Sequence, residues 1–301
     1  MHYIRHYNIQ NAADTSLVDL LCSRFNIFCE NIQPTHTGER YSFNFEVSEN
    51  HPRFDEIECI LPKVFINGRD YDASDLDSRK VYVIYYPVYS EDEYDAAKWL
   101  SVRSSFSKII PRDENAVIQY SCCLGKGKPV STNSMHRNII NALPVKKFSS
   151  WGKRSFASLF YDEHELFCNK QTRDILMEAR INGINFVSAY SNGTKGNDIY
   201  SMHADLYVPN EAIVPESDMD VCKCPICNMS MLAYNNTRGT FAIKASLLDD
   251  NVDFYKTLPM FLAAVNKGGG FSRTIISQKL FRFIKDNKMD RALYFTPLST
   301  V

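Results

Sequence analysis

Two stretches of the chain show the same pattern of side chains when they are aligned without gaps, and this limits the fold more than any other feature. Phe167–Phe186 and Ile275–Tyr294 both predict a strand, a polar N-cap, a helix of about three turns, a tight turn and a second strand. The N-caps are Asn169 and Ser277, and the helix stops are Asn182-Gly183 and Asp290-Arg291. The pattern predicts an internal duplication. Chance similarity is the alternative, because such units recur in many α/β proteins.

The other predicted elements complete an α+β protein of two lobes. Ser90 and Glu93 have the spacing of a capping box, which predicts that a helix begins there. The further elements that we predict include strands at Tyr41–Val47, Glu58–Phe65 and Val81–Tyr86 and helices at Leu17–Phe25, Ser90–Ile109 and Asp253–Val265. We expect an N-terminal α+β lobe with an antiparallel sheet at residues 1–147. A C-terminal lobe at residues 148–301 would hold the duplication and a cluster of cysteines.

Three cysteines of this cluster, Cys222, Cys224 and Cys227, stand within six residues. The spacing of the last two is that of half a zinc knuckle, in which a tight turn directs two thiolates at one tetrahedral ion. A structural zinc takes four protein ligands, and the nearest upstream candidates for the fourth are His203 and Cys168. The sequence has no HExxH and no HxE before the PCxxC, so we expect a structural zinc rather than a catalytic one. Reduced cysteines in a turn and a degenerate site are the alternatives.

Charge is distributed unevenly along the chain. The formal net charge of −1 argues against a general nucleic-acid binder. Residues 41–95 nevertheless hold 13 acidic and 5 basic side chains, whereas residues 96–160 hold 2 acidic and 11 basic ones. These segments either neutralise each other in the fold, remain solvated, or include one that docks a charged partner.

The sequence also predicts where the protein works. The chain opens into polar sequence and holds no run of about 20 apolar residues, so we expect neither a signal peptide nor a membrane span. Its nine cysteines, with Cys122 and Cys123 adjacent, favour reduced thiols and a metal cluster over a disulfide framework. Both features predict a cytoplasmic protein.

Acidic side chains concentrate in one loop and at the start of the helix that follows it. They are Asp70, Asp72, Asp75 and Asp77 in the loop and Glu91, Asp92 and Glu93 in the helix. These carboxylates would suit a basic protein partner, because occlusion of a partner requires complementary charge rather than reactive groups. The rival interpretation is acid–base catalysis by Glu91–Glu93 or by Asp162–Glu165. We expect both groups to be exposed caps or loop charges, since no nucleophile motif or cofactor fingerprint accompanies them.

The C-terminal half carries a family resemblance in four segments taken together. They are the Cys224–Cys227 knuckle, Asp253–Lys256, Phe271–Leu280 and Tyr294–Leu298. In this order they resemble the bacterial double-CXXCG motif proteins, over roughly residues 150–301. Members look like immunity proteins of contact-dependent or polymorphic toxin systems. The resemblance implies a non-enzymatic protein that binds a cognate toxin protein and neutralises it by occlusion.

The chain departs from the family pattern at two points. It has no second CxxC, and Asn228 stands where the knuckle has glycine. A metal would therefore be held through Cys222 instead of the missing pair, or not at all. A zinc-knuckle regulator that binds nucleic acid through the basic run Lys126–Arg154 is the alternative function. The net charge and the lack of an evident recognition helix favour the immunity protein.

Overall fold

The computed structural model describes residues 2–12, 15–34, 41–60, 80–106, 120–121, 138–139, 151–159, 162–189, 198–214, 219–223, 230–234, 241–257, 261–262 and 272–301. The chain is an α+β protein, as predicted. It divides into two compact units, which are Met1–Glu93 with Tyr234–Gly239 and Tyr94–Ala233 with Thr240–Val301. The boundary that we predicted between residues 147 and 148 differs from this division. The difference arises because Trp99–Ser104 pairs with strands from the end of the chain.

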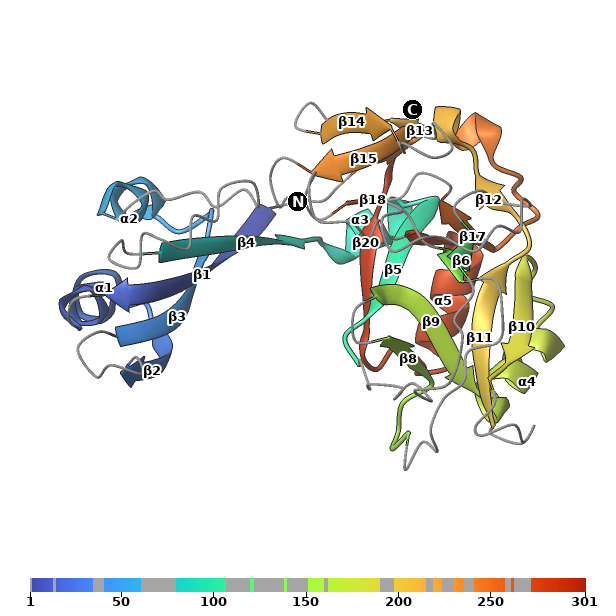
Figure 1. Ribbon diagram of the computed structural model, residues 1–301, viewed down its shortest axis with the longest axis horizontal. Helices are drawn as coiled ribbons and strands as arrows, with labels where there is room; N and C mark the ends of the chain where they lie inside the picture. Colours follow the sequence, from blue (N-terminus) through green and yellow to red (C-terminus); the bar gives the residue numbers. More distant parts are fainter. Residues whose placement is uncertain are drawn as a thin grey trace. The chain divides into compact units, whose positions relative to one another are not determined.

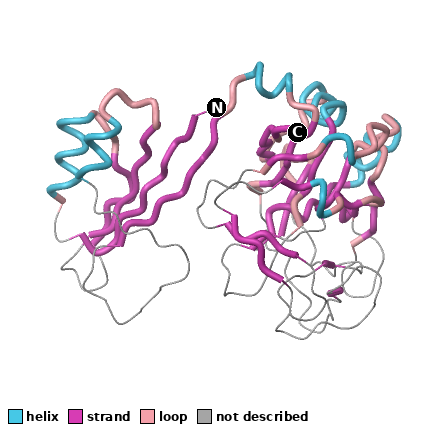
Figure 2. The backbone as a smooth tube through the Cα atoms, turned by 90° about the horizontal axis from the view of Figure 1, so that it is seen from above, coloured by secondary structure: helices cyan, strands magenta, loops and turns pink. Residues whose placement is uncertain are grey.

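The first unit is a four-stranded antiparallel sheet that carries two helices (Figures 1 and 2). Its elements are β1 (His2–Ala12), α1 (Ser16–Phe25), β2 (Cys29–Pro34), β3 (Tyr41–Ser48), α2 (Phe54–Ile60) and β4 (Lys80–Val88), and the sheet order is β2-β3-β1-β4. Both helices cover one face, because alternate residues of β1 and β3 share a core with apolar residues of the helices. The strand predictions at Tyr41–Val47 and Val81–Tyr86 are confirmed, as is the helix at Leu17–Phe25. The strand predicted at Glu58–Phe65 is wrong where the structure describes it, since residues 58–60 end the helix α2.

The capping box is confirmed, but the long helix that we predicted after it is wrong. Ser90 N–H donates to Glu93 Oε2 at 2.8 Å, and Glu93 N–H donates to Ser90 Oγ at 3.2 Å. The helix, α3, is only Glu91–Ala96, and β5 follows it at Trp99–Ser104. All residues of β5 except Arg103 are buried, because the strand lies inside a sheet and packs on both faces. Such a strand lacks the two-residue alternation that identifies half-buried strands in a sequence.

The second unit holds two larger sheets and several short ones (Figure 1). The larger sheets have the orders β12-β17-β19-β5-β20 and β10-β11-β9-β8, and the shorter ones β13-β16-β21, β14-β15-β18 and β6-β7. The bounds up to residue 204 are β6 (Tyr120–Ser121), β7 (Asn138–Ile139), β8 (Phe156–Leu159), β9 (Asp162–Asn169), α4 (Lys170–Glu178), β10 (Ile184–Ser188) and β11 (Ile199–Ala204). The later strands are β12 (Tyr207–Val208), β13 (Ile213–Val214), β14 (Met219–Lys223), β15 (Ser230–Tyr234), β16 (Ala242–Ile243), β17 (Phe254–Thr257), β18 (Phe261–Leu262), β19 (Thr274–Ser277), β20 (Leu293–Pro297) and β21 (Ser299–Thr300). The remaining helices are α5 (Gln278–Asp286) and 3₁₀ turns at Asn210–Ala212 and Ala245–Leu247.

The helix predicted at Asp253–Val265 is wrong. The structure has strands β17 and β18 there, and all four residues of β17 are buried. Aromatic and β-branched side chains favour a pleated, buried position over a helical one. Pairing of β17 with β19 supplies the hydrogen bonds that an isolated stretch of sequence does not reveal.

The two similar stretches of sequence adopt the same supersecondary structure. In the first, β9 and β10 are both antiparallel to β11, which lies between them. In the second, β19 and β20 are both antiparallel to β5, which lies between them. Each stretch is therefore a split βαβ unit, in which a helix connects two parallel strands that are separated by one further strand.

The caps of α4 and α5 match position by position. Asn169 Oδ1 accepts from Thr172 N–H at 2.7 Å, and Ser277 Oγ accepts from Leu280 N–H at 3.1 Å, as the N-cap predictions require. Both helices end earlier than predicted, in a turn with Arg180 at φ 52° or Lys288 at φ 53°. In each turn the next amide donates to a carbonyl five residues back, which is a Schellman motif without glycine.

A buried carboxylate, Asp253, connects the two split units. Its side chain accepts from Asn182 N–H at 3.0 Å, from Ser277 Oγ at 2.8 Å and from Lys279 Nζ at 2.8 Å. Asp253 is only 2% exposed, so these donors replace the water that the charge loses on burial. Since Asn182 lies in the turn after α4 and Ser277 caps α5, the carboxylate holds the turn after one helix against the N-terminus of the other.

Candidate functional site

The predicted cysteine ligands fall largely outside the described residues. The structure describes only the backbone of Cys222, in β14, and neither Cys224 nor Cys227. Within the described ranges, no three His, Cys, Asp or Glu side chains gather as a metal site. The zinc site therefore stays a prediction for these three cysteines.

The predicted fourth ligand, His203, lies half-buried on β11 with one ring nitrogen unused. Its Nε2 is buried and has no hydrogen-bonding partner among the residues that the structure describes. Burial lowers the pKa of His203, which the Glu165 carboxylate opposes and the Lys256 ammonium reinforces. Zinc binds the neutral form of imidazole, so this side chain is suited to be a ligand.

The other upstream candidate, Cys168, belongs to the hydrophobic core. It lies on β9, fully buried with Leu166, Leu176 and Met202. Burial raises the pKa of the Cys168 thiol well above its usual range. A metal requires the thiolate, so this position favours packing over coordination.

Beside His203 lies a buried ion pair that sequence reasoning missed. Lys256 Nζ on β17 binds Glu165 Oε2 on β9, and the two residues are 6% and 7% exposed. Ser201 Oγ donates to Glu165 Oε1 at 3.4 Å. Tyr207, in register with Lys256, is half-buried, and burial raises its pKa. We call Glu165, Ser201, His203, Tyr207 and Lys256 the buried polar cluster.

The expectation that Asp162–Glu165 forms exposed caps or loop charges is wrong for Glu165. This residue lies on β9 in a run of four buried residues that extends to Cys168. Its counter-charge comes from Lys256, 91 residues further along the chain. The one local signal was the apolar run that follows Glu165, which is typical of a buried strand.

The predicted partner-binding acids are described only at α3. Asp70, Asp72, Asp75 and Asp77 lie outside the described residues. Glu91 and Asp92 are exposed in the first turn of α3, whereas Glu93 is engaged in the capping box. Carboxylates in the first turn of a helix are also favoured by its dipole, so these residues combine a local role with exposed negative charge.

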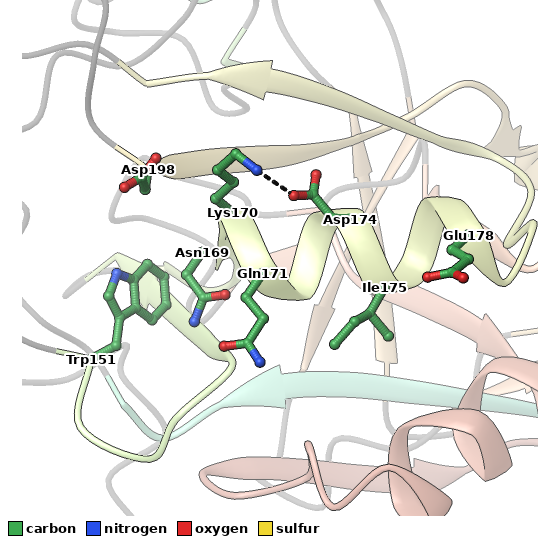
Figure 3. A pocket seen from close by; sticks show the side chains of 8 residues that line it. All are labelled: Trp151, Asn169, Lys170, Gln171, Asp174, Ile175, Glu178 and Asp198. Carbon is green, nitrogen blue, oxygen red and sulfur yellow. Dashed lines mark hydrogen bonds and ion pairs between the residues drawn. The ribbon is translucent and has the colours of Figure 1, made fainter.

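A groove runs along the outer face of α4 (Figure 3). Its volume is about 640 Å³, and it is lined by Trp151, Asn169, Lys170, Gln171, Asp174, Ile175, Glu178 and Asp198. The helix presents residues four apart to the groove, and Trp151 and Asp198 lie near its first turn. This groove could not be predicted from the sequence, because Trp151 and Asp198 come from separate segments of the chain.

Among the described residues, no helix has the length and apolar character that a bilayer crossing requires. Comparison with known proteins adds no assignment. No family model, curated protein or solved structure matches the chain.

Proposed function

We propose that the chain is a non-enzymatic immunity protein that binds a cognate bacterial toxin in the cytoplasm and neutralises it by occlusion. The observation that carries the proposal is the acidic start of α3. Glu91 and Asp92 are exposed there, and the reciprocal hydrogen bonds of Ser90 and Glu93 hold the turn in place. A fixed pair of exposed carboxylates is suited to a basic partner, because its charges need no reordering on binding.

The buried polar cluster supports a non-enzymatic protein. Lys256 and Glu165, which could otherwise act as base or acid, bind each other and are almost fully buried. A buried pair of this kind is weak evidence for stability, but it can specify one packing arrangement of the strands that carry it. Neither group is then available to a substrate in this conformation.

Charge reversal at Glu91 and Asp92 tests the proposal. We expect the chain to restore growth of cells that express the toxin encoded beside it and to form a stable complex with that toxin. The double variant Glu91→Lys/Asp92→Lys should weaken toxin binding by about tenfold or more, because two complementary charges become repulsive. Calorimetric titration of the purified pair measures the dissociation constant.

The matched control is Asp19→Lys, which reverses an exposed acid in the first turn of α1. It should leave toxin affinity unchanged. Equal affinity in the Glu91/Asp92 variant would remove the α3 acids from the interface. Absence of both rescue and complex formation with the wild-type chain would contradict the immunity function itself.

We also propose that Cys222, Cys224 and Cys227 hold a structural zinc with His203 as the fourth ligand. The unused, buried Nε2 of His203 supports this assignment. Elemental analysis should find about one zinc ion per chain in the wild type, and much less in Cys224→Ser/Cys227→Ser and in His203→Ala. Cys22→Ser, which changes an exposed free cysteine, should retain the metal. A wild-type protein purified without zinc after growth with added zinc would contradict the site.

A further inference from the structure

Two cysteines of the first unit face each other where α1 meets the edge strand β2. Cys22 is in the second half of α1, and Cys29 is the first residue of β2. Their side chains are hydrogen-bonded to each other, and both are free thiols. Sulfur atoms in hydrogen-bonding contact meet the first requirement of a disulfide, which is that the two cysteines point toward each other.

The backbone between the two cysteines fixes their approach. Asn26 ends α1 in the left-handed conformation, with φ 55°. The amides of Asn26 and Ile27 both donate to Leu21 O, which closes the helix in a tight turn. Leu21, Ile27 and Cys29 also belong to one hydrophobic core. The contact between Cys22 and Cys29 is therefore held by the helix end and the core rather than by a loose loop.

The two thiols differ in their access to solvent. Cys22 is exposed, whereas Cys29 is only 5% exposed. Burial, and to a lesser extent the neighbouring Cys22, raises the pKa of the Cys29 thiol to about 12. An oxidant in solution therefore reaches Cys22 first, while Cys29 remains a protonated thiol beside it. An accessible cysteine next to a second thiol that resolves its oxidation is the arrangement of redox-sensing sites.

We propose that Cys22 and Cys29 are a redox-sensitive pair that forms a reversible disulfide when the chain meets hydrogen peroxide. The Cys22 thiol loses its proton, and its sulfur attacks one peroxide oxygen. The O–O bond breaks, Cys22 becomes a sulfenic acid, and the other oxygen takes up the proton and leaves as water. The Cys29 sulfur then displaces the sulfenic hydroxyl group, which leaves as water with the Cys29 proton. Two thiols are oxidised to one disulfide, and the peroxide is reduced to water.

This modification site is independent of the proposed immunity function. Disulfides in a reducing cytosol are usually transient and redox-sensing, so both thiols stay reduced until an oxidant appears. The bond would tie α1 to β2, which lies at the edge of the four-stranded sheet. It would thereby restrain the strand that has a neighbour on one side only.

Tryptic digestion detects the bond directly, because Arg24 lies between the two cysteines. Cleavage gives His6–Arg24, which contains Cys22, and Phe25–Arg40, which contains Cys29, and neither peptide has another cysteine. The full chain is treated with hydrogen peroxide, blocked with N-ethylmaleimide and digested without reductant. Mass spectrometry should then find the two peptides as one linked species, lighter than their sum by two hydrogen atoms. Dithiothreitol should separate them.

The variant Cys29→Ala tests the order of the two steps. Without the second thiol the sulfenic acid on Cys22 should persist, so labelling of Cys22 by dimedone should rise several-fold over the wild type. The matched control is Cys59→Ser, which removes another exposed free thiol of the same unit and should leave the linked species unchanged. The proposal is overturned if the wild type forms no linked species, or if Cys22 is linked to Cys59 as often as to Cys29. Equal dimedone labelling of the wild type and Cys29→Ala would also overturn it.

Discussion

Glu165→Gln is expected to destabilise the second unit by about 3–5 kcal/mol, because it leaves the Lys256 ammonium buried without its counter-charge. The ion pair lies between β9 and β17, so loss of one partner weakens the contact between two strands of different sheets. Denaturant unfolding followed by tryptophan fluorescence measures the change, since both tryptophans, Trp99 and Trp151, belong to this unit.

Two further variants separate the cause of this loss. The double change Glu165→Leu/Lys256→Met removes both charges and should recover most of the stability, because an apolar pair of similar volume avoids the desolvation penalty. Lys98→Met breaks an exposed pair with Asp250 and should cost less than about 1 kcal/mol. If Glu165→Gln costs no more than Lys98→Met, then the pair is not the buried, coupled contact that we describe.

The sequence predicted the elements whose signals are local. The capping box of Ser90 and Glu93 and the N-caps Asn169 and Ser277 form as expected, because each needs only a side chain and an amide three residues away. The half-buried strand Tyr41–Val47 was also predictable, since its alternation reflects one apolar and one exposed face.

The elements that depend on distant pairing were not predictable in this way. Trp99–Ser104 and Phe254–Thr257 become strands because each lies inside the same sheet, next to β19. Their partners are far away in sequence, and burial on both faces removes the alternation. The helix ends at Arg180 and Lys288 were missed for another reason, since a left-handed residue that is not glycine gives no clear signal.

The candidate sites show the same division. His203 was predicted as a ligand because it is close to the cysteines in the sequence. The charged neighbours that the structure shows are instead Glu165 and Lys256, which no spacing rule in the sequence connects to it. The groove on α4 likewise depends on the approach of Trp151 and Asp198 to one helix. The pattern of residues along a sequence does not show which distant segments meet in the folded chain. Sites built from such segments are therefore found only in the structure.

Gly183→Ala is expected to destabilise the second unit by about 2–5 kcal/mol. This loss is the sum of two costs: the left-handed backbone conformation that alanine would have to adopt, and the overpacked contact that its Cβ would make. Gly183 has φ +89°, and a Cβ there would lie 2.7 Å from Phe254 O and 2.6 Å from Val252 Cγ1. The chain cannot shift freely to relieve the contact. Gly183 O accepts from Asp205 N–H, and the neighbouring Asn182 N–H donates to Asp253. Thermal unfolding followed by tryptophan fluorescence measures the loss.

Gly152→Ala separates the two contributions. Gly152 also has a positive φ, +56°, but a Cβ there would meet only Arg154 Nη1 at 3.6 Å. This variant should lose about 1–2 kcal/mol, the backbone part alone. A larger loss for Gly183→Ala would show that close packing of the turn after α4 against β17 holds the two split units together. Equal losses would mean that the turn yields, and that its packing against β17 adds nothing beyond the strain of the backbone.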